Sequence, residues 1–73
     1  MYSLVGVDGN AFFVMGYVAR AMKREGFSEE EIEEYRQQAM SGDYSHLIVV
    51  SADYVEMCND RANKDQDEAD EAF

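Results

Sequence analysis

The sequence predicts a small α+β domain, with two to three helices and a short two-stranded antiparallel ribbon that joins its N- and C-terminal ends. Apolar residues recur at helical spacing in two segments, and the second segment opens on a strong helix-start signal. Short β-prone runs lie near both ends of residues 1–58, whereas residues 59–73 are acidic and have no large apolar side chain before Phe73. We therefore expect one compact domain over residues 1–58 and a disordered acidic tail over residues 59–73.

Length and composition restrict the class of protein. The chain has 73 residues, 47% of them hydrophobic, which is enough for one core. Its single cysteine, Cys58, cannot form an internal disulfide, as suits a reducing compartment. The apolar run at 11–19 falls short of the about 20 residues that span a bilayer, and the N-terminus lacks the early basic residues of a secretion signal. These features predict a cytoplasmic protein with no membrane partner.

Net charge is the strongest global signal. The 16 Asp and Glu residues outnumber the 6 Lys and Arg residues, for a net charge of −10. Phosphate backbones and anionic membranes repel such a chain, so direct binding of nucleic acid is not expected. A basic protein surface is the natural partner.

The first two elements are predicted in the N-terminal third. Residues 2–7, YSLVGV, are short, apolar and β-prone, which indicates a strand. Asp8, Gly9 and Asn10 end this strand, and either Asp8 or Asn10 can cap a helix over about residues 11–25. Gly26 stands where a left-handed residue would end the helix. One face of the helix carries the apolar residues Ala11, Val14, Met15, Val18 and Met22.

The second helix has the clearest start signal. Ser28 is its N-cap and Glu31 completes a capping box, while Phe27 and Ile32 can form a hydrophobic staple across the first turn. Gly42 is expected to end this helix in the C′ position. Its buried stripe is predicted to consist of Ile32, Tyr35, Ala39 and, to one side, Met40.

From Asp43 onward two interpretations remain open. The run HLIVVSADYV at 46–55 is rich in β-branched residues, yet its spacing also suits a helix that Asp43 caps. We favour a helix from Tyr44 to Asp53, followed by a strand at 54–58, YVEMC, that pairs with residues 2–7. A strand over residues 47–51 is the alternative.

The stretch SGDYSHL at 41–47 contains the residue types of a catalytic triad. Ser45 and His46 are adjacent, so their side chains point apart on a helix and do not suit nucleophilic catalysis. Structural roles for Gly42 and Asp43 explain the stretch better than a catalytic role does. The alternative is that His46 serves as a ligand or a base. The acidic run from residue 63 fails as a calcium loop because Glu68 stands where glycine is required. No metal or cofactor is expected.

Two surfaces are candidates for binding a partner. On the second helix four carboxylates crowd the outer side, and residues four apart stand about 6 Å apart along the axis, much like adjacent phosphates. This face either imitates a phosphate row or is simply a solvated face; it consists of Glu29, Glu30, Glu33 and Glu34. On the first helix, aromatic and Arg residues of the kind that anchor interfaces share the side opposite the apolar stripe. They are Phe13, Tyr17, Arg20 and Arg24, unless Phe13 and Tyr17 are buried beneath the strands.

Two segments, GVDGNAFF at 6–13 and EEEIEEYRQQAMSGDYSHL at 29–47, resemble a family of small, mostly uncharacterised bacteriophage and prophage proteins. The family pattern is close to LDGNAF followed by SGDYDHLL; Val7 here takes the usual Leu position and Ser45 the usual Asp position. The resemblance covers about residues 5–55 and implies a phage or mobile-element origin, a compact α+β fold and action on host machinery. The positions that carry it are Asp8, Gly9, Asn10, Phe12, Gly42, Asp43, Tyr44 and His46.

Charge and resemblance together predict a non-enzymatic, phage-type inhibitor in the cytoplasm of an infected bacterial host, as in anti-CRISPR or anti-restriction proteins. It would occupy the basic nucleic-acid-binding surface of a CRISPR effector or restriction enzyme. Glu30, Glu33 and Glu34 would pair with Lys and Arg, and Phe13 and Tyr17 would add apolar anchors. The alternative is a phage structural or regulatory protein that forms a homodimer through its first helix. A small-ligand pocket near the start of that helix and the lone histidine is a third hypothesis.

Overall fold

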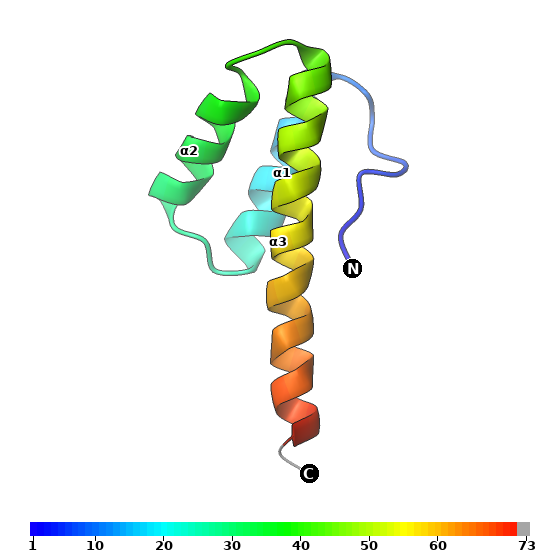
Figure 1. Cartoon of the computed structure of the whole chain (residues 1–73), viewed down its shortest axis with the longest axis vertical. Helices are drawn as coiled ribbons and strands as arrows, with labels where there is room; N and C mark the ends of the chain where they lie inside the picture. Colours follow the sequence, from blue (N-terminus) through cyan, green and yellow to red (C-terminus); the bar gives the residue numbers. More distant parts are fainter. Residues whose placement is uncertain (72–73) are drawn as a thin grey trace.

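Three α-helices and an irregular N-terminal segment make up the computed structural model, which describes the backbone of residues 1–71 and the side chains of residues 1–63 (Figure 1). Helix α1 spans Ala11–Arg24, α2 spans Glu29–Ala39 and α3 spans Tyr44–Glu71. The long α3 packs against both other helices, and the N-terminal segment runs along its far side from α2. Residues 1–71 contain no strand, so the fold is all-α and the predicted α+β fold with its ribbon is wrong.

The N-terminal segment forms turns instead of the strand expected over residues 2–7. The Val7 amide donates to the Leu4 carbonyl, and Gly6 has a positive φ of 85°, which bends the chain away from extended backbone. The Tyr2 amide donates to Asn59 Oδ1 at 2.7 Å, and Asn59 Nδ2 donates to the Tyr2 carbonyl at 2.9 Å. A side-chain amide on α3 therefore satisfies the backbone groups that a second strand would have paired.

The residues expected to form a second strand belong to α3. The helix continues through 47–51 and 54–58, because its buried residues recur every three or four positions and their burial outweighs the tenths of a kcal/mol that β-branched residues cost in a helix. Val49, which lies between the buried positions, is 61% exposed. A strand that is buried on both faces would not leave this side chain exposed. The buried stripe of α3 consists of Leu47, Ser51, Val55 and Cys58.

The boundary expected between residues 58 and 59 falls inside α3. Beyond it, Asn59 holds Tyr2, and Arg61 places its guanidinium 3.6 Å from the centre of the Phe27 ring. The first residues of the expected tail therefore pack against the domain. Disorder of the remaining tail stays a prediction, and residues 72–73 lie outside the described part of the chain.

Local signals set both ends of α1 and the start of α2 as predicted. Asn10 is the N-cap of α1: its Oδ1 accepts from the Phe12 amide at 2.9 Å, while Asp8 in turn accepts from the Asn10 amide. Gly26 follows the end of α1 with a φ of 86°. At the start of α2, the capping box forms in both directions between Ser28 and Glu31.

The core has one polar contact at its centre. The Tyr35 and Ser51 hydroxyls lie 2.6 Å apart and both residues are fully buried, so a single hydrogen bond joins α2 to α3 inside the core. The Tyr54 ring packs against Tyr35 at a centroid distance of 4.9 Å. The apolar residues around this contact include Val14, Met15, Val18, Met22, Ile32, Ala39, Leu47 and Val55.

Removing the Ser51 hydroxyl should destabilise the protein, because the buried Tyr35 hydroxyl is left without a partner. Ser51→Ala is expected to lower the free energy of unfolding by about 1–3 kcal/mol, and adding Tyr35→Phe should recover part of the loss. Tyr35→Phe alone should cost less, since a helical serine can bond to the carbonyl four residues earlier. Urea unfolding of the two single variants and the double variant measures these differences. Equal stability of Ser51→Ala and the wild type would contradict the assigned role.

Alkaline pH should also destabilise the fold. Burial raises the pKa of the Cys58 thiol and of the Tyr35 and Tyr54 phenols, so the folded state holds these protons more tightly than the unfolded chain. The stabilisation is complete below the unfolded pKa values, which are about 8.5 for Cys and about 10 for Tyr, and is lost as pH rises above them through the higher pKa values of the folded state. The urea midpoint should therefore fall between about pH 8 and about pH 10.5, and in Cys58→Ala the fall should begin later. A midpoint that stays constant over this range would contradict the expectation.

Candidate functional site

The predicted glutamate face lies on the outer side of α2, and all four of its members are exposed. Glu29 pairs with Lys23 at 3.8 Å, but both side chains are largely solvated, so the pair contributes little to stability. Glu30, Glu33 and Glu34 have no ion-pair partner among the side chains of residues 1–63. Their charge is therefore available to a partner.

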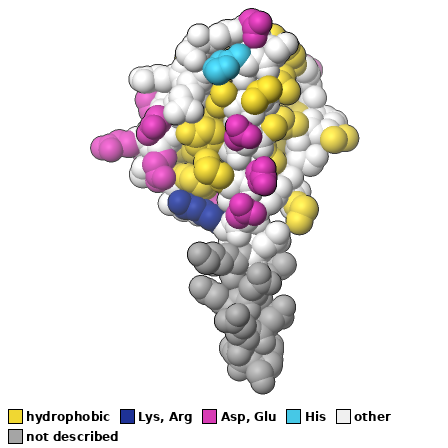
Figure 2. All heavy atoms as spheres, in the orientation of Figure 1, with side chains coloured by type: hydrophobic (Ala, Val, Ile, Leu, Met, Phe, Trp, Pro, Cys, Tyr) yellow, Lys and Arg dark blue, Asp and Glu magenta, His cyan; other side chains and the backbone are white. Residues whose placement is uncertain are grey.

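Helix α3 adds carboxylates that the sequence analysis did not assign to a site. Asp53, Glu56 and Asp60 are exposed at spacings of three and four residues, so they share one side of α3. Figure 2 shows acidic side chains on both sides of a band of hydrophobic side chains on this face of the molecule. The strand predicted at residues 54–58 hides this acidic side, because it ends the helix at Asp53; helical periodicity beyond Asp53 is the signal in the sequence that would reveal it.

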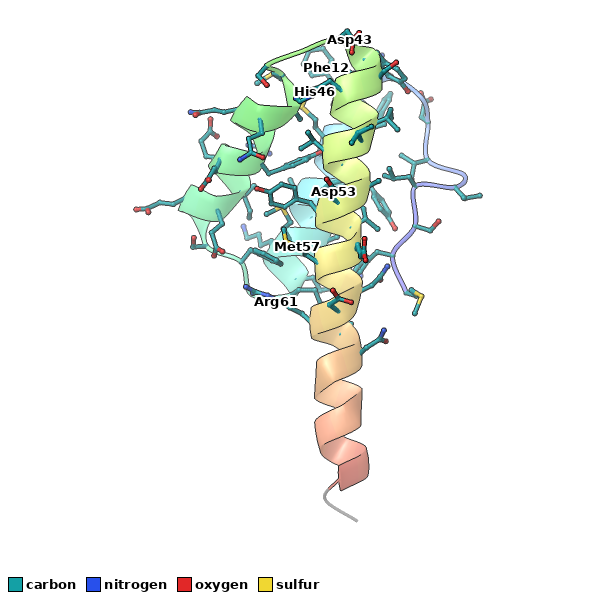
Figure 3. The ribbon with its side chains drawn as sticks, in the orientation of Figure 1. Phe12, Asp43, His46, Asp53, Met57 and Arg61 are labelled. Carbon is teal, nitrogen blue, oxygen red and sulfur yellow. The ribbon has the colours of Figure 1, made fainter. Side chains whose placement is uncertain are left out.

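A groove of about 450 Å³ lies between α2 and α3, and we call it the α2–α3 groove. Arg61 lies at one end of it, where the guanidinium covers Phe27 and Nη1 donates to the Glu25 carbonyl at 3.2 Å (Figure 3). Burial raises the pKa of the Tyr54 phenol, and the nearby carboxylates of Glu34 and Glu31 raise it further. The lining residues are Phe27, Glu31, Glu34, Tyr54, Met57, Asp60 and Arg61.

The aromatic residues proposed on the first helix lie elsewhere. Phe13 is 60% exposed, whereas Tyr17 is half-buried and its hydroxyl accepts a hydrogen bond from the Ser3 amide at 2.9 Å. Both line a hollow against the N-terminal segment together with Arg20. Within the described residues this hollow includes none of the α2 glutamates, so the structure does not join the two candidate surfaces into one site.

The residues that carry the family resemblance meet at one end of the helical bundle. The Tyr44 hydroxyl, at the start of α3, donates to the Gly9 carbonyl at 2.5 Å, just before α1. Phe12 is 78% exposed beside an apolar hollow of about 280 Å³ that Met40 and Tyr44 also line. Asp43 caps α3 as predicted, by accepting from the His46 amide at 2.9 Å.

His46 closes the last turn of α2. Its Nε2 lies 2.9 Å from the Gln38 carbonyl oxygen and 3.1 Å from Ser41 Oγ, and Ser41 donates to the same carbonyl. Because a carbonyl oxygen only accepts, Nε2 carries the hydrogen and cannot take a proton from Ser41. The network therefore adds side-chain donors to a helix-end carbonyl that also accepts from the Ser41 amide at 3.2 Å, and does not form a nucleophile–base pair.

Gly42 does not end α2 by a left-handed conformation, since the positive-φ glycines of residues 1–71 are Gly6 and Gly26. The C′ role predicted for Gly42 is wrong. A Cβ at position 42 would stand 2.8 Å from Cγ of His46, so glycine is required there by the close approach of the imidazole.

The substitution Gly42→Ala should destabilise the fold, because the added methyl group overlaps the His46 side chain. A loss of about 1–3 kcal/mol is expected, as for other overpacked sites. Gly16→Ala is the matched control: no atom lies within 4 Å of its Cβ position and it sits inside α1, so the free energy of unfolding should rise by about 0.5–1 kcal/mol. Thermal unfolding compares the two variants, and a neutral Gly42→Ala would contradict the assigned contact.

Fold and surface together define a small all-α domain with an acidic groove whose floor is apolar. Comparison with protein-family models, curated proteins and solved structures finds no match for this chain. Within the described residues, no group of three His, Cys, Asp or Glu side chains could hold a metal ion. None of the helices, as far as they are described, is long and apolar enough to cross a membrane.

Proposed function

We propose that this chain is a non-enzymatic acidic protein that binds a basic surface of another protein and keeps nucleic acid from that surface. The observation that supports the proposal is a set of exposed carboxylates on α2 that have no ion-pair partner among the side chains of residues 1–63: Glu30, Glu33 and Glu34. Carboxylates of α3 extend the negative field on the same face of the molecule. Such a field speeds encounter with a basic surface and repels competing acidic proteins.

The proposed target is a host nucleic-acid-handling defence complex, such as a CRISPR effector or a restriction enzyme, in the cytoplasm of an infected bacterium. The resemblance to small phage proteins supports this choice, and the net charge of −10 supports competition with a polyanion. Lys and Arg side chains that normally contact phosphates would pair with the glutamates of α2. Because these pairs are exposed, the inhibition should weaken as salt screens them.

A homodimer through α1 is less well supported than this surface. The chain's own N-terminal segment covers part of that face, since Ser3 binds the Tyr17 hydroxyl. A partner copy would have to displace this segment before it could use Tyr17 as an anchor.

Neutralising the three glutamates should weaken inhibition. In a mobility-shift assay with a panel of CRISPR effectors and restriction enzymes on their DNA sites, the wild type should displace DNA from its target. Glu30→Gln/Glu33→Gln/Glu34→Gln should be at least about tenfold less potent, since three exposed ion pairs contribute about 0.5 kcal/mol each.

The matched control is Asp65→Asn/Asp67→Asn/Glu68→Gln, which removes the same net charge from a different part of the sequence. It should retain most of the potency of the wild type. Equal loss in both triple variants would mean that net charge alone acts, and equal potency of the α2 variant and the wild type would exclude the glutamate face. Failure to displace DNA from any complex would reject the proposed target.

A further inference from the structure

The α2–α3 groove has an apolar floor between acidic rims. Met57 is 40% exposed on that floor, beside the half-buried Tyr54. Glu34 stands on the α2 side and Asp60 on the α3 side. Ion pairing with a flat basic surface would use the rims and leave the floor in water, so the floor indicates a partner with an apolar side chain of its own.

The charges around the groove select a basic partner. Of the lining residues that carry charge, Glu31, Glu34 and Asp60 are acidic and only Arg61 is basic. The guanidinium of Arg61 is held at one end, over Phe27 and against the Glu25 carbonyl, and its single positive charge is outnumbered by the three carboxylates. Arg36 of α2 lines a different hollow, which α1 and α2 form together. The net field over the floor is therefore negative.

The shape of the groove favours a helix as the occupant. Its walls are two helices, and its lining on α3 runs from Tyr54 to Arg61, about 10 Å, the length of two helical turns. An amphipathic helix offers apolar anchors three or four residues apart with basic residues on either side, which matches a floor between two acidic rims. Methionine adapts to anchors of different shape, so Met57 suits this role.

We propose that the α2–α3 groove binds a basic amphipathic helix of the target protein, which lays an apolar side chain on Met57 and Tyr54 and sets Lys or Arg against Glu34 and Asp60. This inference rests on the proposed function, because it specifies the form of the basic surface that the acidic face recognises. It adds that part of the binding is apolar and therefore persists in salt.

Fluorescence titration with a synthetic peptide tests the inference. The probe is a 14-residue peptide of Lys and Leu at helical spacing with one Trp in the apolar face; since the chain has no Trp, the signal comes from the peptide alone. The wild type should bind it with a blue shift of the emission. A scrambled peptide of the same composition should bind at least about tenfold more weakly, because it cannot present one apolar face.

Two matched variants locate the binding site. Met57→Gln keeps the length of the side chain but makes the floor polar. It should lower the affinity for the peptide by at least about fivefold. Met40→Gln alters a methionine that is 57% exposed and lines a different hollow, and should bind as the wild type does. Equal binding by Met57→Gln and Met40→Gln, or equal affinity for the scrambled peptide, would overturn the inference.

The two proposals fail separately. If the protein displaces DNA from a target and the three glutamates are needed, but Met57→Gln inhibits as well as the wild type, then the helix is rejected and the acidic binding function stands. If Met57→Gln weakens peptide binding but no CRISPR effector or restriction enzyme is inhibited, then the groove is retained and the target is rejected.

Discussion

The buried Tyr35 side chain packs α2 against α3, where its hydroxyl meets that of Ser51, and the placement of the acidic residues on α2 depends on this contact. Helix α2 buries three residues, of which Tyr35 is the largest, so Tyr35 is its main anchor in the core. The Tyr35 ring reaches across the core and also supports Tyr54 in the floor of the groove. The contact that stabilises the core therefore sets the separation of the two acidic rims.

Placing acids on both walls has an energetic cost. Like charges on two packed helices repel each other, and the apolar core has to offset this repulsion in a chain that is small for a single domain. A basic partner would relieve the repulsion and would thus bind the folded state in preference to the unfolded chain. In the proposed complex, binding and stability would be linked through the same carboxylates, so a surface that is unfavourable for the isolated protein would be favourable once the partner is bound.

The sequence was most informative where structure is determined locally. Asn10 at the start of α1 and the capping box of Ser28 and Glu31 act within one turn, so both helices were predicted close to their observed limits. The extent of α3 was not predicted, because Leu47, Val55 and Cys58 form a buried stripe only when α3 packs against α1 and α2. The groove was missed for the same reason, since its floor and rims come from separate helices. Even Gly42 acts through a residue packed over it, not through its own backbone preference.

The link between Tyr2 and Asn59 has a consequence for the order of folding. These residues are separated by 57 positions, whereas the chain reverses direction between successive helices within a few residues. Contacts between neighbours in sequence form quickly, so we expect the N-terminal segment to dock after α3 has formed and carries Asn59 into position. We also expect the segment to detach before the helices separate. Detachment would expose Tyr17, and the amides of Tyr2 and Ser3 would then exchange with solvent hydrogen before those of the core.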